Sequence, residues 1–280
     1  MKKYISALLC LLFLSGCTAG MKDSTEQSTV SQQSNTSSTN VAETTVRIDN
    51  VLAQNYDTQK VVWGPGRGEN HERPSEPVSL QEKYGELGAQ FIMSDERYIC
   101  LTFDEGYENG YTPAILDTLK EKGVKAVFFV TYDFASENPE LIERMIDEGH
   151  IIGNHTYRHL TMDEIAVEKA SEEVMYLDKY MKQQYKYRMK LFRFPKGEFS
   201  ENTLALVNEL GYKSIFWSFA YADWDTQNQV DNASAFSEIT DNFHNGEIML
   251  LHAVSATNAE ILGDVVDEAK AQGYEFTTEL

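Results

Sequence analysis

Three short motifs in this sequence carry acidic and histidine side chains of the kinds that hydrolases use. They are the adjacent acids Asp104 and Glu105, the pair His155 and His159, and the single His252. Each motif directly follows an apolar run that is typical of a buried strand. In β/α barrels and open α/β sheets, the loops after the strands meet on one face, where catalytic residues collect. We therefore expect these side chains to form one site, suited to metal-assisted hydrolysis.

The two histidines of the second motif lie four residues apart. On a helical turn this spacing places both imidazoles on one face, within reach of one ion. A lone pair of this kind is also common on helix surfaces and in helix caps, but His155 and His159 come directly after the apolar run 151–153. We expect the pair to open a helix there and to bind a divalent metal ion, with Zn2+ expected from the imidazole ligands.

The adjacent acids end the run 98–103 and precede Gly106, which allows a tight turn. An acidic pair is commonly only a solvated turn, but here an apolar strand carries it to the site. One carboxylate could complete a site of two histidines and one carboxylate, with an open position for water. The other could remain free as a general base.

Polar residues also follow other strand-like runs. Arg193 and Lys196 lie in the segment RFPKG, which is either a rigid surface loop or part of the site. Asp223 and Trp224 follow a run of aromatic residues, which either fill the core or offer platforms for sugar rings. His252, directly after its apolar run, is either a core residue or a catalytic acid.

The elements that must position these residues repeat along the chain from Tyr98 onward. The unit is a strand, a polar loop, an amphipathic helix, a glycine and the next strand, with about seven strands in all. The glycines lie where a left-handed residue ends a helix; they are Gly123, Gly149, Gly211 and Gly273. Helix starts are predicted at Asn138-Pro139 and, as capping boxes, at Thr161 and Thr257. The alternation predicts a parallel α/β sheet or barrel.

The N-terminal part of the chain has a different composition. Residues 1–16 have two lysines and a short apolar stretch, which is typical of an export signal and too short to span a bilayer. The segment LSGC resembles a bacterial lipobox, so we expect cleavage before Cys17 and lipidation of Cys17; an ordinary signal peptide is the alternative. Residues 17–50 form a Ser/Thr-rich tether that is predicted to be disordered.

We read residues 51–94 as an extension that wraps the main domain, with a short helix around Leu80–Leu87, and residues 95–280 as the catalytic domain. The net charge of −20 argues against nucleic acid as a partner and against a basic membrane-binding patch. Membrane contact is expected only through the lipid on Cys17, on the outer face of the cell membrane. Cys100 lies in a strand run and is expected to be buried and inert.

Taken in order, the motifs resemble those of the polysaccharide deacetylase family (NodB homology, carbohydrate esterase family 4). The resembling segments are TFDEG at 102–106, HTYRH at 155–159, RFPKG at 193–197, DW at 223–224 and LLH at 250–252. The resemblance covers about residues 95–280. Longer stretches, such as TFDEGYENGYT and LLHAVSATN, resemble the spore branch that forms muramic δ-lactam.

The resemblance implies a distorted (β/α)7 barrel and a role for each motif. Its implied catalytic residues are Asp104 as general base, Arg193 as the residue that orients it, His252 as general acid and Asp223 as the residue that tunes the acid. Its implied metal ligands are His155 and His159. The chemistry is consistent, because an amide needs its oxyanion stabilised and its amine protonated as it leaves.

This sequence departs from the family at Glu105, where the usual residue is an aspartate ligand and the δ-lactam branch often has asparagine. Glu105 either ligates a shifted ion or lies aside. Lys196, Trp224 and Tyr107 are the expected substrate-binding residues.

The expected substrate is peptidoglycan, and the expected reaction is N-deacetylation of muramic acid, leading to the δ-lactam of spore cortex. Deacetylation of N-acetylglucosamine in peptidoglycan or a chitin-like polymer is the alternative enzymatic reading. A glycan-binding lipoprotein with a degenerate metal site is the non-enzymatic one. We expect a monomer that acts on glycan strands.

Overall fold

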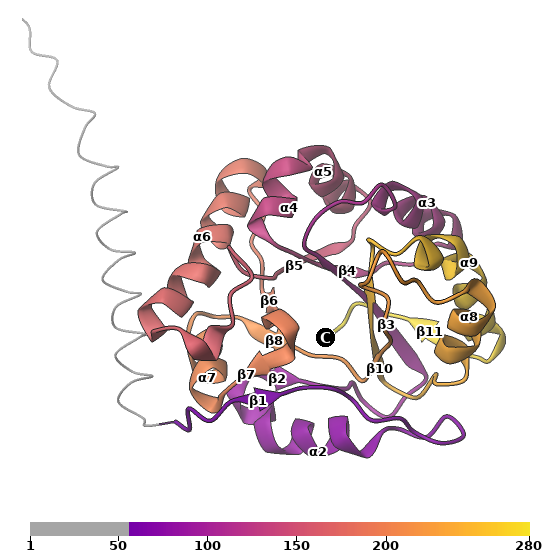
Figure 1. Cartoon of the computed structure of the whole chain (residues 1–280), viewed down its shortest axis with the longest axis horizontal. Coiled ribbons are helices and arrows are strands. Elements are labelled where there is room, and N and C mark those ends of the chain that lie inside the picture. Colours follow the sequence, from indigo (N-terminus) through magenta and orange to yellow (C-terminus); the bar gives the residue numbers. More distant parts are fainter. Residues whose placement is uncertain (1–55) are drawn as a thin grey trace, which may run out of the picture. The chain divides into compact units, whose positions relative to one another are not determined.

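The computed structural model describes residues 56–280, and its main feature is a curved, parallel, nine-stranded sheet surrounded by helices (Figure 1). The expected signal peptide, Cys17, the tether and the first residues of the extension lie outside the described residues. The strand order is β2-β8-β6-β5-β4-β3-β10-β9, with β11 beside the start of β3. These strands are β2 (Ala89–Gln90), β3 (Tyr98–Glu105), β4 (Val127–Val130), β5 (Ile151–Asn154), β6 (Leu191–Phe192), β8 (Lys213–Ile215), β9 (Phe219–Ala220), β10 (Glu247–His252) and β11 (Glu275–Phe276).

The alternation of strands and helices that the sequence predicted is confirmed. Helices separate the successive strands β3, β4, β5, β6, β8, β10 and β11, and the sheet curls into an open barrel rather than a closed one. The helices are α3 (Thr112–Lys122), α4 (Tyr132–Glu137), α5 (Pro139–Asp147), α6 (Val167–Tyr185), α7 (Glu201–Glu209), α8 (Asn232–Thr240) and α9 (Ala256–Ala271). The predicted glycines end their helices with φ between 67° and 87°, a region that glycine enters without strain.

Residues 56–94 pack on this sheet and add to it. Strand β1 (Val61–Val62) pairs antiparallel with β7 (Glu198–Phe199), and β2 pairs with β8 inside the main sheet. The helix expected around Leu80–Leu87 is instead α2 (Ser75–Tyr84) followed by a 3-10 turn, Gly85–Leu87. It begins earlier than expected: Pro74 precedes its first residue, and Pro77 lies in the first turn, where a helix does not need the N–H that proline lacks.

Two predicted capping boxes are wrong, whereas the start of α5 at Pro139 is confirmed. The serine before the expected cap, Ser255, caps α9 through its side chain, which accepts a hydrogen bond from the Asn258 N–H. Thr161 precedes only a 3-10 turn, Met162–Glu164, and its side chain makes no cap hydrogen bond. At α9 a local cap two residues earlier than expected therefore sets the helix start, and at Thr161 no α-helix follows the expected box.

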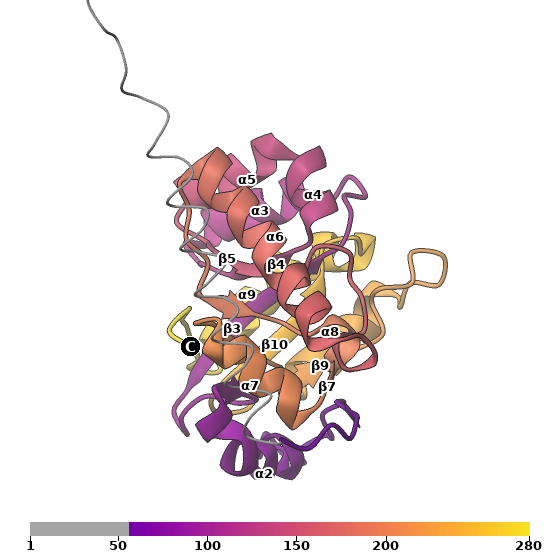
Figure 2. The same ribbon diagram turned by 90° about the vertical axis from the view of Figure 1, so that its left-hand side faces the viewer.

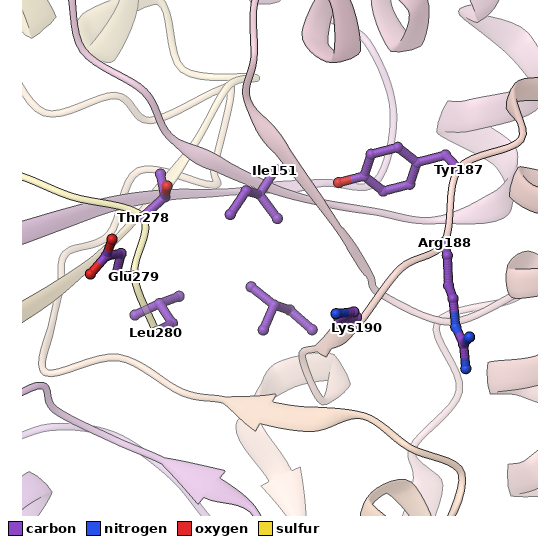
Figure 3. Close-up of a pocket in the computed structure, with 8 residues that line it drawn as sticks. Ile151, Tyr187, Arg188, Lys190, Thr278, Glu279 and Leu280 are labelled. Atoms are coloured by element: carbon purple, nitrogen blue, oxygen red, sulfur yellow. The ribbon is translucent and has the colours of Figure 1, made fainter.

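The edge of the sheet where the parallel strands begin and the edge where they end have different surroundings. At the N-terminal edge, where β5 and β6 begin, the chain's last residues line a cavity of about 450 Å³ together with Ile151, Tyr187 and Arg188 (Figure 3). The end of the chain lies inside the ring of helices in Figure 1. The polar motifs lie at the opposite, C-terminal edge. In the part of the chain that the structure describes, no helix is long and apolar enough to cross a membrane.

Candidate active site

The polar motifs that the sequence predicted meet at the C-terminal edge of the sheet, at the ends of strands from β10 across to β5. Asp104 is near the end of β3 and His252 ends β10, and their Cα atoms are partners in the parallel register of these strands. On the other side of β3 lies β4, and beyond it β5, which leads directly into His155. This proximity follows from parallel pairing, because strands running the same way bring their carboxyl ends to one edge.

Asp104 is held in an ion pair with Arg193. The Arg193 Nη1 atom donates to Asp104 Oδ1 at 2.8 Å, and Asp104 Oδ2 lies 3.5 Å from the Nε2 atom of His155. Burial by itself would raise the pKa of Asp104, but the adjacent Arg193 guanidinium and the two nearby imidazoles hold it below its usual value. The Asp104 carboxylate is therefore ionised and able to accept a proton.

Arg193 is wholly buried, and all three of its nitrogens are engaged by the protein. Besides Asp104, it donates to Thr102 Oγ1 at 2.9 Å and to two backbone carbonyls, of Ile215 and Phe216. Its guanidinium also lies 4.1 Å from the ring centroid of Phe129. Arg193 thus positions Asp104 and, because it has no exposed surface, is not available to a substrate, which the sequence had left open.

His155 and His159 come together as predicted, but not on a helix. The residues after His155 form a loop in which Thr156 and His159 have φ values of 75° and 56°, which an α-helix excludes. The Asn154 side chain accepts a hydrogen bond from the Thr156 N–H, and the Thr156 hydroxyl accepts one from the His159 N–H. Side chains thus provide hydrogen-bond acceptors for these two backbone N–H groups of the loop. The expectation of a helical turn is wrong because these local hydrogen bonds replace the helical ones.

The two imidazoles fit a bound metal ion. The Nδ1 atom of His155 donates to the Arg193 carbonyl at 2.9 Å, so a neutral ring keeps its Nε2 lone pair for the site. Burial lowers the pKa of His155, and burial and the neighbouring imidazole lower that of His159 to about 4, so both rings are neutral. Their Nε2 atoms are 3.1 Å apart, close to the roughly 3.3 Å expected for two ligands of tetrahedral zinc.

Glu105, by contrast, is buried with an unsatisfied carboxyl group. Both of its carboxylate oxygens are buried without a hydrogen-bond partner, and its pKa is raised by burial and by the nearby Glu108 and Asp104. Successive residues of a strand point to opposite faces, which favours Asp104 over Glu105 as the side chain that β3 directs into the site. Within residues 56–280, no group of three or more His, Cys, Asp or Glu side chains is arranged to hold a metal ion.

His252 lies on the other side of Asp104 and is oriented by Asp223. The His252 Nδ1 atom donates to Asp223 Oδ1 at 2.7 Å, and the backbone N–H of His252 donates to Asp223 Oδ2, also at 2.7 Å. Burial lowers the pKa of His252, but the Asp223 carboxylate outweighs it and leaves the pKa above its ordinary value. The protonated imidazole is favoured, with its Nε2 proton facing the site.

Sequence reasoning missed Asn258, a residue that holds this pair. Its side-chain Nδ2 donates to Asp223 Oδ2 at 2.6 Å and to the His252 carbonyl at 3.1 Å, while its Oδ1 accepts from the Tyr221 hydroxyl. Asn258 is buried in the first turns of α9, and a buried asparagine in a helix is the only signal that could have indicated it.

The predicted substrate-binding residues lie around the rim. Trp224 is 60% exposed with its ring 6.4 Å from that of His252, and Tyr107 is 51% exposed just after β3. Lys196 is exposed and lies 3.4 Å from the Thr161 hydroxyl, on the side of His159, whose pKa its charge helps to lower. Exposed aromatic rings and a cation at the rim are suited to binding an acidic sugar.

The buried thiol is not part of this site. Cys100 lies in β3 with no exposed surface, as predicted, and burial raises its pKa to about 12. The nearby Arg193 only partly opposes that shift. Cys100 is therefore an inert core residue.

Comparison with known proteins agrees with this arrangement. Residues 93–215 match the family described as polysaccharide deacetylase. The chain is 40% identical over 229 residues to the peptidoglycan-N-acetylmuramic acid deacetylase PdaA of Bacillus subtilis, covering 80% of this chain and 86% of PdaA. It is 29% identical over 231 residues to a peptidoglycan-N-acetylglucosamine deacetylase of Bacillus cereus, covering 81% of this chain and 80% of that protein.

Solved structures give the same result. The structure of Bacillus subtilis PdaA, described as a family 4 carbohydrate esterase, superposes with a TM-score of 0.76 at 38% identity, over 79% of this chain and 95% of that one. A family 4 carbohydrate esterase from Bacillus anthracis gives 0.66 at 38% identity, with the same coverage. The predicted barrel is thereby confirmed. The chain belongs to the polysaccharide deacetylases, the family 4 carbohydrate esterases, and is a hydrolase of N-acetyl amides.

Proposed function

We propose that this enzyme removes the N-acetyl group from muramic acid residues of peptidoglycan. The freed amine would then condense with the lactyl carboxyl, with loss of water, to give muramic δ-lactam. The observation that carries the proposal is the placement of Asp104 and His252 on partner positions of β3 and β10, one ionised and the other favouring its protonated form. The similarity to PdaA, which is named for that sugar, supports the substrate.

Asp104 acts as the general base. Its carboxylate is held at one oxygen by Arg193, which leaves Oδ2 to take a proton from the attacking water. The ion pair favours the ionised carboxylate and fixes its direction, both of which a base requires. Arg193 is a positioning residue, because it touches Asp104 and not the substrate.

His252 acts as the general acid. An amine leaves an acyl carbon only when it is protonated, so the site needs a proton donor opposite the base. Asp223 fixes the Nδ1–H of His252, which places the transferable proton on Nε2. Asn258 holds Asp223 in turn, so that the imidazole cannot rotate away.

A divalent ion held by His155 and His159, with zinc as the expected one, would polarise the acetyl carbonyl and stabilise the oxyanion. With only two protein ligands in place, the remaining coordination positions stay available to water and substrate. Glu105 takes no part in this set and is expected to keep its proton.

Lys196 selects the form of the substrate. A muramic acid without its stem peptide carries a free lactyl carboxylate close to the acetamido group. Lys196 is exposed beside His159, whereas Arg193 is wholly buried, so Lys196 is the cation that can pair with that carboxylate. A stem peptide would replace the charge with an amide and remove a charge-assisted contact.

Mass spectrometry of digested peptidoglycan tests the proposal. Peptidoglycan pretreated with an amidase, which removes stem peptides, should release acetate and yield muramic δ-lactam when the enzyme is added. Intact peptidoglycan and chitin oligomers should release little. Equal acetate release from all three, or deacetylated glucosamine without lactam, would replace this reading with an N-acetylglucosamine deacetylase.

We also propose that the enzyme is exported and anchored through a lipid on Cys17. The apolar stretch within residues 1–16 and the segment LSGC support this, and residues 17–50 would then hold the catalytic domain away from the bilayer. Cell fractionation tests it. Wild-type protein should sediment with membranes, and Cys17→Ser should not be lipidated. Membrane retention of an unlipidated Cys17→Ser protein would refute the anchor.

A further inference from the structure

A group of aromatic residues beside the active site takes no part in the proposed chemistry. Tyr132 begins α4 directly after β4, Tyr157 lies between the two site histidines after β5, and Tyr176 lies on α6. We call these three residues and Arg158 the tyrosine platform. The rings of Tyr157 and Tyr176 are stacked with centroids 3.9 Å apart, and Tyr132 meets both edge-on at 5.2 and 5.1 Å. The helices that carry the platform, α4 and α6, are neighbours in Figures 1 and 2.

Arg158 is held against this stack, and its guanidinium forms no ion pair within residues 56–280. Its guanidinium lies 4.5 Å from the ring centroid of Tyr157, and its Nη2 atom is 3.4 Å from the Tyr157 hydroxyl. Its backbone N–H donates to Glu173 at 2.7 Å, which fixes the chain there. Glu173 acts on the guanidinium through its charge, but no carboxylate within residues 56–280 forms an ion pair with it, although the chain has a net charge of −20. An exposed, preordered and unpaired arginine is suited to binding an anion.

The platform is continuous with the catalytic site. Its central residue, Tyr157, belongs to the same loop as His155 and His159, and the backbone N–H of Tyr132 donates to Thr156 in that loop. Tyr176 has 45% of its surface exposed, so its ring can also contact a ligand. An occupant of the platform would therefore be an extension of the molecule whose acetyl group lies between Asp104 and His252.

We propose that the tyrosine platform binds a second muramic acid of the same glycan strand, with Tyr176 under the sugar ring and Arg158 paired with the lactyl carboxylate. This rests on the proposed function. Aromatic rings present an apolar face to a pyranose, and guanidinium pairs with carboxylate bidentately. Muramic acid supplies both a ring face and a carboxylate. Because muramic acid alternates with glucosamine in peptidoglycan, the second carboxylate lies two sugars from the first.

Steady-state kinetics on peptide-free oligosaccharides of two and six sugars tests the proposal. Arg158→Gln and Tyr176→Leu should each raise KM for the hexasaccharide by about three- to fivefold, with kcat unchanged, because the contact is exposed to solvent. Neither should change KM for the disaccharide, which carries no second muramic acid. Arg188→Gln is the matched control, because Arg188 is an exposed arginine at the opposite edge of the sheet. It should behave as wild type on both.

An unchanged hexasaccharide KM in Arg158→Gln would overturn the proposal. Equal increases for both lengths would also overturn it, because Arg158 would then act on the sugar being cut. Calorimetry of hexasaccharide binding to the Asp104→Asn protein, with and without Arg158→Gln, tests the platform separately from the proposed function, because it measures binding without deacetylation. If the wild type releases no acetate from either oligosaccharide, the proposed function fails. The calorimetry still tests the platform in that case. A three- to fivefold loss of affinity on adding Arg158→Gln supports the platform, and an unchanged affinity overturns it.

Discussion

Asp104 and His252 face each other as register partners across the parallel pair β3–β10. Each forms an ion pair with a residue of opposite charge: Asp104 with Arg193, and His252 with Asp223. One arrangement thus keeps a base ionised and the other keeps an acid protonated, a strand's width apart. Groups whose environments push their pKa values in opposite directions are the usual sign of paired acid and base roles.

Replacing either partner should nearly abolish acetate release. For Asp104→Asn we expect a loss of about 10²–10⁴-fold in kcat, the usual contribution of a general base. His252→Ala should lose about as much while keeping the ion pair between Asp104 and Arg193. Circular dichroism should report folded protein for both. Near-wild-type turnover by a well-folded Asp104→Asn enzyme would rule out its role as base.

The pH profile should reveal the link between Asp223 and His252. Activity requires protonated His252, so it declines as pH rises through the pKa of that residue, which Asp223 raises. In Asp223→Asn this pKa falls, and the alkaline limb of kcat/KM should therefore move to lower pH. Asp231→Asn, at an exposed carboxylate that caps α8, is the control and should leave the limb in place. If the alkaline limb of kcat/KM lies at the same pH in Asp223→Asn as in wild type, another group is the acid.

Metal content should depend on the histidines far more than on Glu105. After dialysis against metal-free buffer, His159→Ala should retain no ion, whereas Glu105→Ala should lose little affinity. Glu105→Gln, which is isosteric, should match wild type, because both oxygens of Glu105 lack partners in the site. Equal losses in His159→Ala and Glu105→Ala would make Glu105 a third ligand. Ion retained by His159→Ala would place the metal elsewhere.

Lys196 should set the preference for peptide-free substrate. Lys196→Gln removes the cation but keeps a polar side chain, and it should lower kcat/KM on amidase-treated peptidoglycan roughly fivefold to tenfold. Activity on untreated peptidoglycan should hardly change, so the ratio of the two rates is the measurement. If that ratio is the same in Lys196→Gln and wild type, the lactyl carboxylate is bound by another residue.

A second buried acid, Glu247 at the start of β10, should make stability depend on pH. Burial raises its pKa well above the usual value, and its Oε1 atom has no hydrogen-bond partner. Above about pH 4.5 the unfolded carboxyl ionises while the folded one keeps its proton, so this residue lowers stability as pH rises. Between pH 5 and pH 8, Glu247→Gln should therefore be more stable than wild type. Its Tm should be higher, and its unfolding free energy should be larger by roughly 1–3 kcal/mol. A constant difference across this range would show that Glu247 is already ionised in the folded state.

Most of the residues that meet at the site could be recognised from residue types and their spacing. Strand-like runs followed by polar residues can be recognised locally, and parallel pairing brings their ends together whatever the details of packing. For that reason the amino-acid order alone was enough to place Asp104, His155 and His252 at one edge of a sheet. The β/α alternation that implies the barrel is equally local, since glycines and caps mark each helix end.

How these residues are oriented and paired depends on the folded conformation. The loop from His155 to His159 is not helical, because Asn154 and Thr156 satisfy its backbone, and a spacing of four residues cannot reveal that. The commitment of Arg193 to Asp104 and to carbonyls from residues 215 and 216 depends on contacts between strands far apart in sequence. Whether Glu105 points into the site depends on the pleat of β3, and Asn258 reaches Asp223 only because α9 packs there. Such contacts depend on relative position in space, which the order of residues along the chain does not contain.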